Sequence, residues 1–334
     1  MAVYTTIDDP EKYFQVKLYT GNATDDTAIT LDGDTDMQPD LIWTKERSQT
    51  GNHNIFDSVR GTSKRLRTET NAAEGTLDPV NQIKSFDSDG FTLGTNNGSN
   101  ENSITFVAYC WKESADSGFD IVSYTGNSTD RTISHSLSAV PKVIIIKNRS
   151  TTNWWHTYHH KIGNNYEVYL NVNNAKGSTD AYQSTDPTSS VFSLDDSVDG
   201  TNGDGNSLIA YLFAEKQGFS KFGSYTGNGS SSDGTFVYTG FRPAFILAKR
   251  TDSTDHWTLW DNKRESNPNN NVLYPSLSDA ESTSDSSYLA DLVSNGVKWR
   301  GTSTGMNASG ANYIYMAFAE APFVNSNGVP CNAR

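Results

Sequence analysis

The stretch Pro39-Asp-Leu-Ile-Trp-Thr-Lys45 has two counterparts further along the chain, Pro141-Lys-Val-Ile-Ile-Ile-Lys147 and Pro243-Ala-Phe-Ile-Leu-Ala-Lys249. The steps from the first proline to the second and from the second to the third are both 102 residues. Tyr-Thr-Gly-Asn precedes each stretch, at residues 19–22, 124–127 and 225–228. An aromatic residue follows each proline at one distance, as Phe56, Tyr158 and Trp260. This pattern predicts an internal triplication of one folding unit.

The repeated unit has about 100 residues, the size of a domain that can bury its own core. We therefore predict three tandem domains, called segment one (14–113), segment two (119–217) and segment three (219–323). Residues 1–13 form an N-terminal arm and residues 324–334 a C-terminal tail. The linkers between segments are short, so neighbouring segments are expected to touch.

Short apolar runs rich in Val, Ile, Tyr, Phe and Trp alternate with Gly, Asn, Asp and Ser clusters, which is typical of β-strands. The unbroken run Val143–Ile146 predicts a central strand buried on both faces. Residues 288–294 could form one short helix. The expected fold class is all-β, with an antiparallel β-sandwich of jelly-roll type in each segment.

Composition excludes several classes of protein. The net charge of −13 argues against a nucleic-acid-binding surface, which needs clustered Lys and Arg. The local basic group of Arg60, Lys64, Arg65 and Arg67 is expected to be a solvated face. No apolar stretch approaches the ~20 residues of a membrane span, and the first residues do not resemble a signal peptide. Cys110, inside an expected strand, is interpreted as a small buried hydrophobe.

Gly301-Thr-Ser-Thr-Gly305 matches the pattern of a hydrolase nucleophile elbow. That elbow requires a strand before the serine and a helix after it, whereas here a second strand is expected to follow. The corresponding loops of the other two segments have no serine at this place. We therefore predict a polar hairpin loop, no catalytic residue and no enzyme activity.

Two clusters invite a metal-site interpretation. His156, His159 and His160 would face both sides of a strand, so three ligands cannot converge without a bulge. The acidic turn Asp32-Gly-Asp34-Thr-Asp36 lacks the glycine and glutamate of an EF-hand, which leaves a solvated turn as the better interpretation and another calcium geometry as the alternative. We predict no cofactor and no zinc.

Aromatic residues fall into two sets by strand parity. Phe56, Tyr158 and Trp260 recur at one place and are predicted to be core residues. Trp155 and Trp257 recur at the neighbouring place, which faces the other side of the strand. They either pack under a loop or a second sheet, or contact a partner subunit or a sugar ring. Trp155, Trp257 and His156 are therefore the candidate partner or glycan contacts.

Several longer stretches carry a resemblance to a known family. They are Val3-Tyr-Thr-Thr-Ile-Asp-Asp-Pro10, Phe56-Asp-Ser-Val-Arg-Gly61, Ala72-Ala-Glu-Gly75, Phe86-Asp-Ser-Asp-Gly-Phe-Thr-Leu-Gly94 and, in segment two, Ile133-Ser-His-Ser-Leu137. Residues 3–215 resemble a repeat module of virion structural, tail-fibre-like proteins from marine tailed bacteriophages. Segment three is a weaker match. The resemblance implies a place in the virion and names no catalytic residue.

The expected function is accordingly that of a non-enzymatic phage virion protein, a tail fibre, spike or other tail-associated protein that presents loop surfaces for assembly or host attachment. The alternatives are a capsid decoration protein on the head and a carbohydrate-binding module for host glycans. Expected partners are other virion proteins and further copies of the chain, as a trimer or higher oligomer assembled in the host cytoplasm. Val3, Tyr4 and Ile7 are the candidate assembly arm, which could add a strand to a neighbouring sheet edge.

Overall fold

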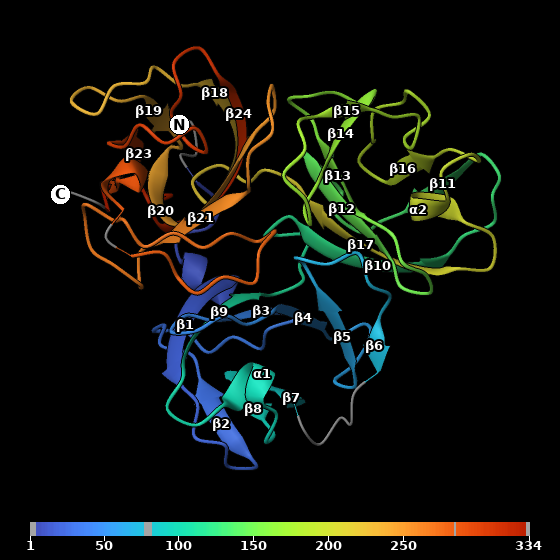
Figure 1. Ribbon diagram of the computed structural model, residues 1–334, viewed down its shortest axis with the longest axis horizontal. Coiled ribbons are helices and arrows are strands. Elements are labelled where there is room, and N and C mark those ends of the chain that lie inside the picture. The colour runs from blue at the N-terminus through green and yellow to red at the C-terminus, as the bar shows by residue number, and fades with distance from the viewer. Residues whose placement is uncertain (1–4, 77–81, 284, 332–334) are drawn as a thin grey trace.

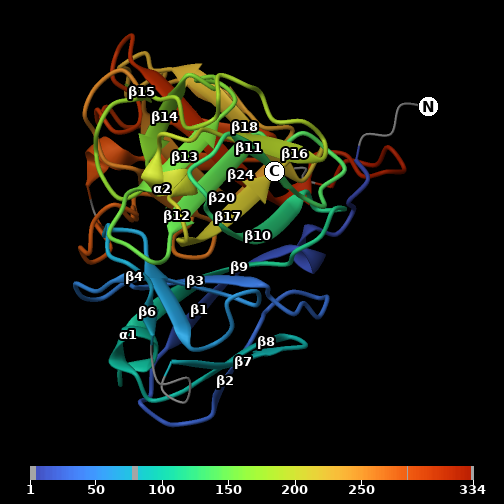
Figure 2. The ribbon, with the colours of Figure 1, turned by 90° about the vertical axis from the view of Figure 1, so that its right-hand side faces the viewer.

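The computed structural model describes residues 5–76, 82–283 and 285–331. The three segments lie around a common centre, with segment one below, segment two at the upper right and segment three at the upper left of Figure 1. Figure 2 shows the same arrangement from the side, with the strands of segment one beneath those of the other two. The fold is all-β, and the paired strands within the described ranges are antiparallel. No helix in the described ranges is long and apolar enough to cross a membrane.

Each segment contributes one large sheet with the same strand order. Segment one has β1 (Phe14–Thr20), β9 (Thr105–Trp111), β3 (Leu41–Glu46), β4 (His53–Asp57), β5 (Lys64–Arg67) and β6 (Gly75–Thr76). Segment two has β10 (Phe119–Thr125), β17 (Ser207–Phe213), β12 (Val143–Asn148), β13 (Trp155–His159), β14 (Tyr166–Tyr169) and β15 (Gly177–Ser178). Segment three has the first four places, as β18 (Ser220–Thr226), β24 (Asn312–Pro322), β20 (Phe241–Arg250) and β21 (Thr258–Asp261).

A smaller sheet belongs to each segment. These sheets are β2 (Thr27–Thr30), β8 (Gly90–Leu93) and β7 (Ile83–Asp87); β11 (Arg131–Ser134) and β16 (Val191–Leu194); and β19 (Phe236–Tyr238), β23 (Gly296–Trp299) and β22 (Ala290–Val293). The helical turns are α1 (Asn97–Asn100), α2 (Asp199–Asn202), η1 (Pro10–Lys12) and η2 (Ser286–Tyr288). The helix expected over residues 288–294 is wrong, because alternating burial in Ala290–Val293 suits a strand of the small sheet.

The register of the large sheets repeats as well as their order. Leu41, Val143 and Phe245 each pair with the residue at the same place in the last long strand, which is Trp111, Phe213 and Phe318. Pro39 and Pro141 each stand two positions before the first residue of β3 and β12, and Pro243 lies near the start of β20, where the pairing with β24 is irregular. The proline therefore marks the start of the same strand in all three segments, where a missing N–H does least harm to a ladder.

The large sheets are buried on both faces. One face packs on the segment's own small sheet, as Ile144 and Ile146 pack on Phe192 in segment two, which makes each segment sandwich-like. The other face, with Val143 and Ile145, joins a hydrophobic cluster to which all three segments contribute. The prediction of a strand buried on both faces is confirmed, and its second cover is the neighbouring segments.

Aromatic rings from different segments meet in this shared core. The ring centroids of Phe14 and Phe318 are 5.2 Å apart, and Trp111 contacts Phe245 edge to face at 5.6 Å. Phe213 reaches Phe318 at 5.9 Å. A cavity of about 40 Å³ with an apolar lining remains at the centre. Because rings supply much buried area per residue, a chain of low hydrophobic content can still close a core in this way.

The Tyr-Thr-Gly-Asn motif anchors a loop at the end of each segment. The hydroxyls of Tyr19, Tyr124 and Tyr225 each donate, at 2.8 Å, to a main-chain oxygen in the connection that precedes the last long strand, which in segments one and two is the helical turn α1 or α2. A Cβ on Gly21 would lie 2.2 Å from the carbonyl oxygen of Glu101, and the other two motif glycines are equally crowded. The motif is therefore structural, and only glycine allows the close approach.

The predicted core aromatics are confirmed, since Phe56, Tyr158 and Trp260 are all buried. Cys110 is also fully buried in β9, and burial raises the pKa of its thiol.

The arm packs on its own chain where it is described. Ile7 is buried in the shared core, and the hydroxyl of Thr5 donates to the main-chain oxygen of Gln217 at 2.9 Å. Val3 and Tyr4 lie outside the described residues.

Candidate functional site

The contact between segments one and two is built on a buried polar network. Asp57, at the end of β4, accepts from the hydroxyl of Tyr211 in segment two at 2.7 Å and pairs with Arg60. Arg60 also reaches Glu74 at 3.1 Å. Glu74 in turn accepts two hydrogen bonds from Arg149 of segment two, at 2.9 and 3.0 Å. One acid, one guanidinium and a second acid thus meet a tyrosine and an arginine from the neighbour.

The contact between segments three and one repeats this network. Asp261 accepts from the hydroxyl of Tyr109 in segment one at 2.8 Å and pairs with Arg264. Arg264 reaches Glu281 at 3.1 Å. Glu281 accepts two hydrogen bonds from Arg47 of segment one, at 2.8 and 3.1 Å.

The contact between segments two and three has different residues at all five places. His159 stands where the other contacts have an aspartate, and its Nε2 lies 3.2 Å from the main-chain oxygen of Tyr315. Ile162 and Lys176 replace the arginine and the second acid, while Thr251 and Met316 replace the neighbour's arginine and tyrosine. The main-chain hydrogen bond from the N–H of Lys176 to the oxygen of Thr251 matches those from Glu74 to Arg149 and from Glu281 to Arg47. The backbones therefore meet in the same way, and only the side chains differ.

Electrostatics separate the two kinds of contact. Although burial alone would lower the pKa of Arg60, the adjacent Tyr211 and Asp57 raise it above its usual range. The pKa of Arg264 is raised in the same way by the adjacent Asp261 and Tyr109. At the third contact, burial with the nearby His160 lowers the pKa of His159 to about 3. The arginines are therefore held charged, and the histidine is held neutral.

Trp155 and Trp257 are buried, which agrees with the alternative that they pack under another part of the chain and leaves no ring face exposed to a glycan. The indole N–H of Trp155 donates to the main-chain oxygen of Arg67 in segment one at 2.9 Å, and that of Trp257 donates to Tyr169 of segment two at 2.8 Å. The cover that these rings require is the neighbouring segment of the same chain. His156 is also buried and lies 2.8 Å from Glu167, so it offers no surface to a ligand.

The three repeated lysines are fully buried near the same contacts. Lys45, Lys147 and Lys249 each donate through Nζ to the main-chain oxygen of the next residue, at 2.6, 2.7 and 2.5 Å. Burial lowers the pKa of each to about 8. A perturbed lysine can mark a reactive site, but a substrate cannot reach a side chain that has no exposed surface. Lys147 and Lys249 also reach main-chain oxygens of the neighbouring segment, those of Asn71 at 3.4 Å and Asn173 at 3.5 Å, which gives these two a role in the contacts between segments.

The histidines of segment two do not form one site. His156 pairs with Glu167, His159 with the Tyr315 oxygen, and His160 with the main-chain oxygen of Phe222 at 2.6 Å. The rings of His159 and His160 stack with their centroids 5.3 Å apart, and both reach segment three, whereas His156 stays within segment two. The histidines are therefore split, but the prediction that His160 shares a side with His156 is wrong, because β13 ends at His159 and strand parity does not extend to His160. In the described ranges, the grouping of acidic, histidine and cysteine side chains that could hold a metal is a different one, formed by Asp130, Asp195 and Asp196.

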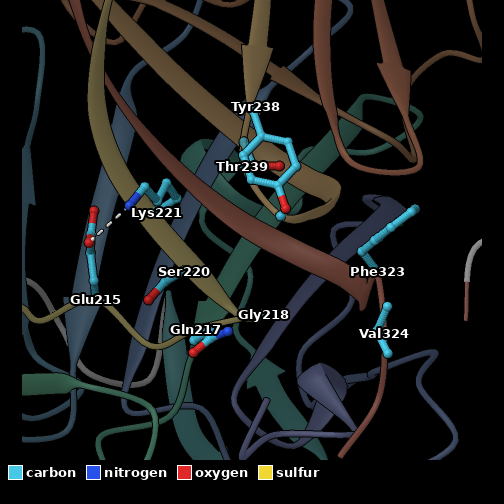
Figure 3. Close-up of a pocket in the computed structure, with 10 residues that line it drawn as sticks. Glu215, Gln217, Gly218, Ser220, Lys221, Tyr238, Thr239, Phe323 and Val324 are labelled. Atoms are coloured by element: carbon cyan, nitrogen blue, oxygen red, sulfur yellow. Dashed lines mark hydrogen bonds and ion pairs between the residues drawn. The ribbon is translucent and has the colours of Figure 1, made fainter. Parts of the chain in front are cut away.

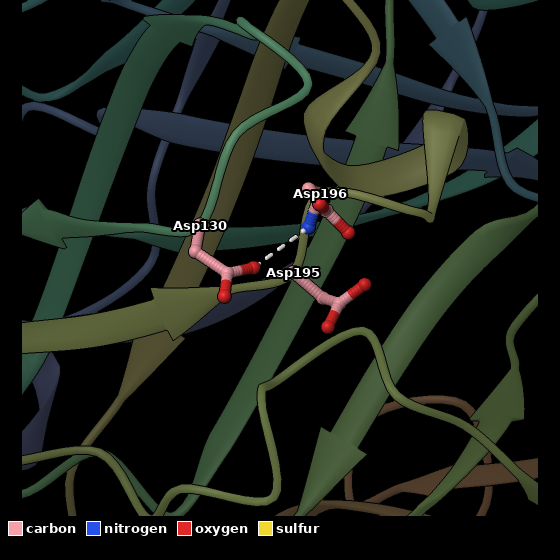
Figure 4. A group of neighbouring side chains, drawn as sticks. All are labelled: Asp130, Asp195 and Asp196. Carbon is pink, nitrogen blue, oxygen red and sulfur yellow. Dashed lines mark hydrogen bonds between the residues drawn. The ribbon is translucent and has the colours of Figure 1, made fainter.

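Figure 4 shows these three carboxylates on two neighbouring loops of segment two. Their oxygens lie within 4.8 Å of one another, and Asp130 accepts a hydrogen bond from the Asp196 N–H at 3.1 Å. Asp195 accepts from the N–H and hydroxyl of Ser197, which lower its pKa. The Asp32 turn does not form such a group, and Asp32 pairs instead with Lys17.

A cleft lies on segment three, beside the linker from segment two (Figure 3). It has a volume of about 520 Å³, and its lining includes Glu215, Lys221, Tyr238 and Phe323. Glu215 and Lys221 form an ion pair at 3.3 Å across one wall. The cleft exists because the connection from β19 to β20 is short: the corresponding loops of segments one and two are longer and bond to Gln15 and Asp120. An exposed tyrosine and one ion pair do not form an acid–base site.

The serine pattern at Gly301–Gly305 lies in the connection between β23 and β24, as a polar loop. The main-chain N–H of Met306 and that of Asn307 point back to the oxygen of Ser303. A turn followed by a strand lacks the helix that a nucleophile elbow requires.

Sequence reasoning missed the network residues. Arg60 was expected on a solvated face and is buried, because Asp57 and Glu74 compensate its charge. The signal was present: the pair Asp57 and Arg60 recurs as Asp261 and Arg264, at twice the 102-residue step between the prolines, while segment two has His159 and Ile162 at the single step. Only the structure shows that Tyr109, Tyr211 and Met316 face these places from the next segment.

The fold and these contacts define a class: an all-β, sandwich-like protein whose segments close around a shared aromatic core. The chain belongs to the family described as domain of unknown function (DUF7483), whose profile matches residues 9–322. The match runs across all three segments as one unit. No curated protein matches the chain.

Proposed function

We propose that this chain is a non-enzymatic virion structural protein of a tailed bacteriophage, a tail fibre, spike or other tail-associated protein. The virion placement rests on the resemblance of residues 3–215 to phage repeat modules. The structural role rests on the recurring polar residues, which form contacts between segments of the same chain. A scaffold that presents loops needs rigidity more than chemistry.

One observation carries the structural role. The recurring ionisable and aromatic residues face neighbouring segments of the same chain, as Asp57 faces Tyr211 and Trp155 faces Arg67. These acids and cations are thereby enclosed, while the loops that connect the strands differ in sequence from one segment to the next. Such a body can be placed in a particle as one rigid unit that displays those loops.

The alternative function, glycan binding, now rests on fewer candidate residues. Trp155 and Trp257 are enclosed, so a sugar ring would have to stack on an exposed aromatic side chain. Trp154 is 41% exposed and Tyr238 is 60% exposed. Glycan-array binding that is lost in Trp154→Ala and kept in Trp155→Phe would favour this second function.

The deciding experiment is to locate the protein on purified particles. We expect an antibody against the chain to label the tail in electron microscopy, with quantitative mass spectrometry giving a small multiple of three or six copies per particle. Dozens to hundreds of copies on the head would favour capsid decoration instead. Absence of the chain from purified particles would overturn the virion role altogether.

Assembly through the arm can be tested on the same particles. Deletion of residues 2–4 leaves Thr5 and Ile7 in their places on the chain, so the body should keep its melting temperature. We expect the shortened protein to fail to join the particle if Val3 and Tyr4 attach it. Normal incorporation would assign attachment to another surface.

A further inference from the structure

The three contacts between segments fall into two kinds that differ at five matched places. The contacts from segment one to two and from segment three to one have Asp, Arg and Glu on one side and Arg and Tyr on the other. The contact from segment two to three has His, Ile and Lys on one side and Thr and Met on the other. The main-chain hydrogen bonds across the three contacts correspond. The five places thus change together while the backbone geometry is kept.

Mixing the two kinds would leave buried groups without partners. Asp57 opposite a methionine would lose the hydroxyl that now donates to it at 2.7 Å. Glu74 opposite a threonine would lose both hydrogen bonds of the guanidinium. An unpaired buried charge or acceptor destabilises strongly, whereas a fully apolar replacement can be neutral.

The opposite mixture fails for the same reason. Lys176 opposite an arginine would bring like charges together, and a tyrosine hydroxyl from the neighbour would meet His159 at the place where the polar contacts have an aspartate. In its present contact, Lys176 is exposed and lies over the Tyr166 ring at 4.4 Å, and Ile162 packs on the shared core. Each side therefore suits one kind of neighbour only.

We propose that these five places form a pairing code that decides which side of one segment accepts which side of the next, and so fixes the order of the segments around the centre. Segment one alone presents both halves of the polar kind, Asp57, Arg60 and Glu74 on one side and Arg47 and Tyr109 on the other. The partner that fits both of its sides is therefore a further copy of segment one. Segments two and three each present one half of each kind and do not match themselves. This inference does not depend on the virion role.

The code is tested in the full chain by converting the third contact to the polar kind. One variant changes the segment-two side, with His159→Asp, Ile162→Arg and Lys176→Glu. A second changes the segment-three side, with Thr251→Arg and Met316→Tyr. A third carries all five substitutions. Thermal unfolding is measured for each.

We expect each half-converted chain to melt roughly 5 to 10 °C below the parent, because it buries unpaired charges or an unpaired hydroxyl. The fully converted chain should recover at least half of the summed loss, since the two sides then match. The code is also supported if the half-converted chains do not fold and the fully converted chain does. Additive losses, or a fully converted chain that does not fold, would overturn the code.

A matched control separates pairing from mere size and charge. The segment-two variant is combined with Thr251→Lys and Met316→Phe, which add a cation and a ring but neither the planar guanidinium nor the hydroxyl. No recovery is expected. If this control recovers as much as the arginine and tyrosine do, the five places set bulk packing rather than pairing.

Discussion

The contact between segments one and two and the contact between segments two and three have one backbone geometry and opposite chemistry. At the first, Asp57, Arg60 and Glu74 are held by hydrogen bonds from Tyr211 and Arg149. At the second, Thr251 accepts a main-chain hydrogen bond from Lys176, His159 bonds to the main-chain oxygen of Tyr315, and Met316 and Ile162 lie in the shared core. The difference teaches that the fold tolerates either a fully paired polar contact or an apolar one, and that the two sides must agree.

This agreement explains why the segments diverge so freely elsewhere. A residue on the loop surface can change alone, whereas a residue at a contact can change only with its partner on another segment. Buried ion pairs add little to net stability compared with apolar packing, but breaking one is costly. The polar contacts therefore serve specificity more than stability.

The largest effect is expected where a polar contact loses its central cation. Arg264→Ala leaves Asp261 and Glu281 without their shared guanidinium, so the free energy of unfolding should fall by about 3–5 kcal/mol. Chemical denaturation measures it. The matched control Arg300→Ala removes a half-exposed pair with Asp291 and should change little, about 0–1 kcal/mol. Equal losses would mean that the buried network contributes no more than a surface pair.

Acid should weaken the apolar contact through His159. Burial, with His160 and Lys161, lowers its pKa to about 3 from an ordinary 6.5. The unfolded chain therefore binds a proton below pH 6.5 that the folded chain does not accept, and the free energy of unfolding falls as pH falls from 6.5 towards 3. The slope from this group approaches about 1.4 kcal/mol per pH unit.

The measurement is urea unfolding across that pH range, in the parent and in His159→Gln. The difference between the two isolates His159 from the other groups that titrate there. The variant should not show the part of the decrease in free energy of unfolding at low pH that His159 causes. Parallel curves for the two proteins would show that His159 takes up its proton equally in both states.

A smaller loss is expected from the tyrosine hydroxyls. Tyr211→Phe removes the donor to Asp57 and should lower the free energy of unfolding by about 1.5–3 kcal/mol. Met316→Leu at the matched place keeps volume and breaks no hydrogen bond, so less than about 1.5 kcal/mol is expected. If the leucine variant loses as much as the phenylalanine variant, the two contacts do not differ as described.

The smallest effect concerns the outer arginine. Arg149→Lys keeps the charge but loses the bidentate hydrogen bond to Glu74 at a partly exposed site. The free energy of unfolding should fall by about 1 kcal/mol. Thr251→Ser at the same place of the apolar contact should change stability by less than half of that. Denaturant midpoints of both variants against the parent provide the comparison.

Much of the fold could be predicted from the sequence because strand patterns are local. The run Val143–Ile146, the repeated prolines and the aromatic place of Tyr158 were enough for an all-β, sandwich-like fold with those residues in strands and core. The short helix over 288–294 was wrong, because pairing with β23 outweighed a weak local preference.

The candidate site was predicted less well because its partners are far apart in sequence. Trp155 and Trp257 could be assigned to one face of a strand, but local pattern cannot tell whether that face meets solvent, a ligand or another segment. Tyr211 lies 154 positions from Asp57 along the chain, and no spacing rule connects them.

By itself the sequence determined the class of strands, the period of the repeat, the core aromatics and the absence of a helix after Ser303, since each depends on residues close together in the chain. Only the tertiary structure decided that the second face of each large sheet is covered by the other segments, that Arg60 and the repeated lysines are buried, and that five places pair across each contact. The physical reason is that burial and charge pairing depend on which surfaces meet, and three segments closing around one core decide that together.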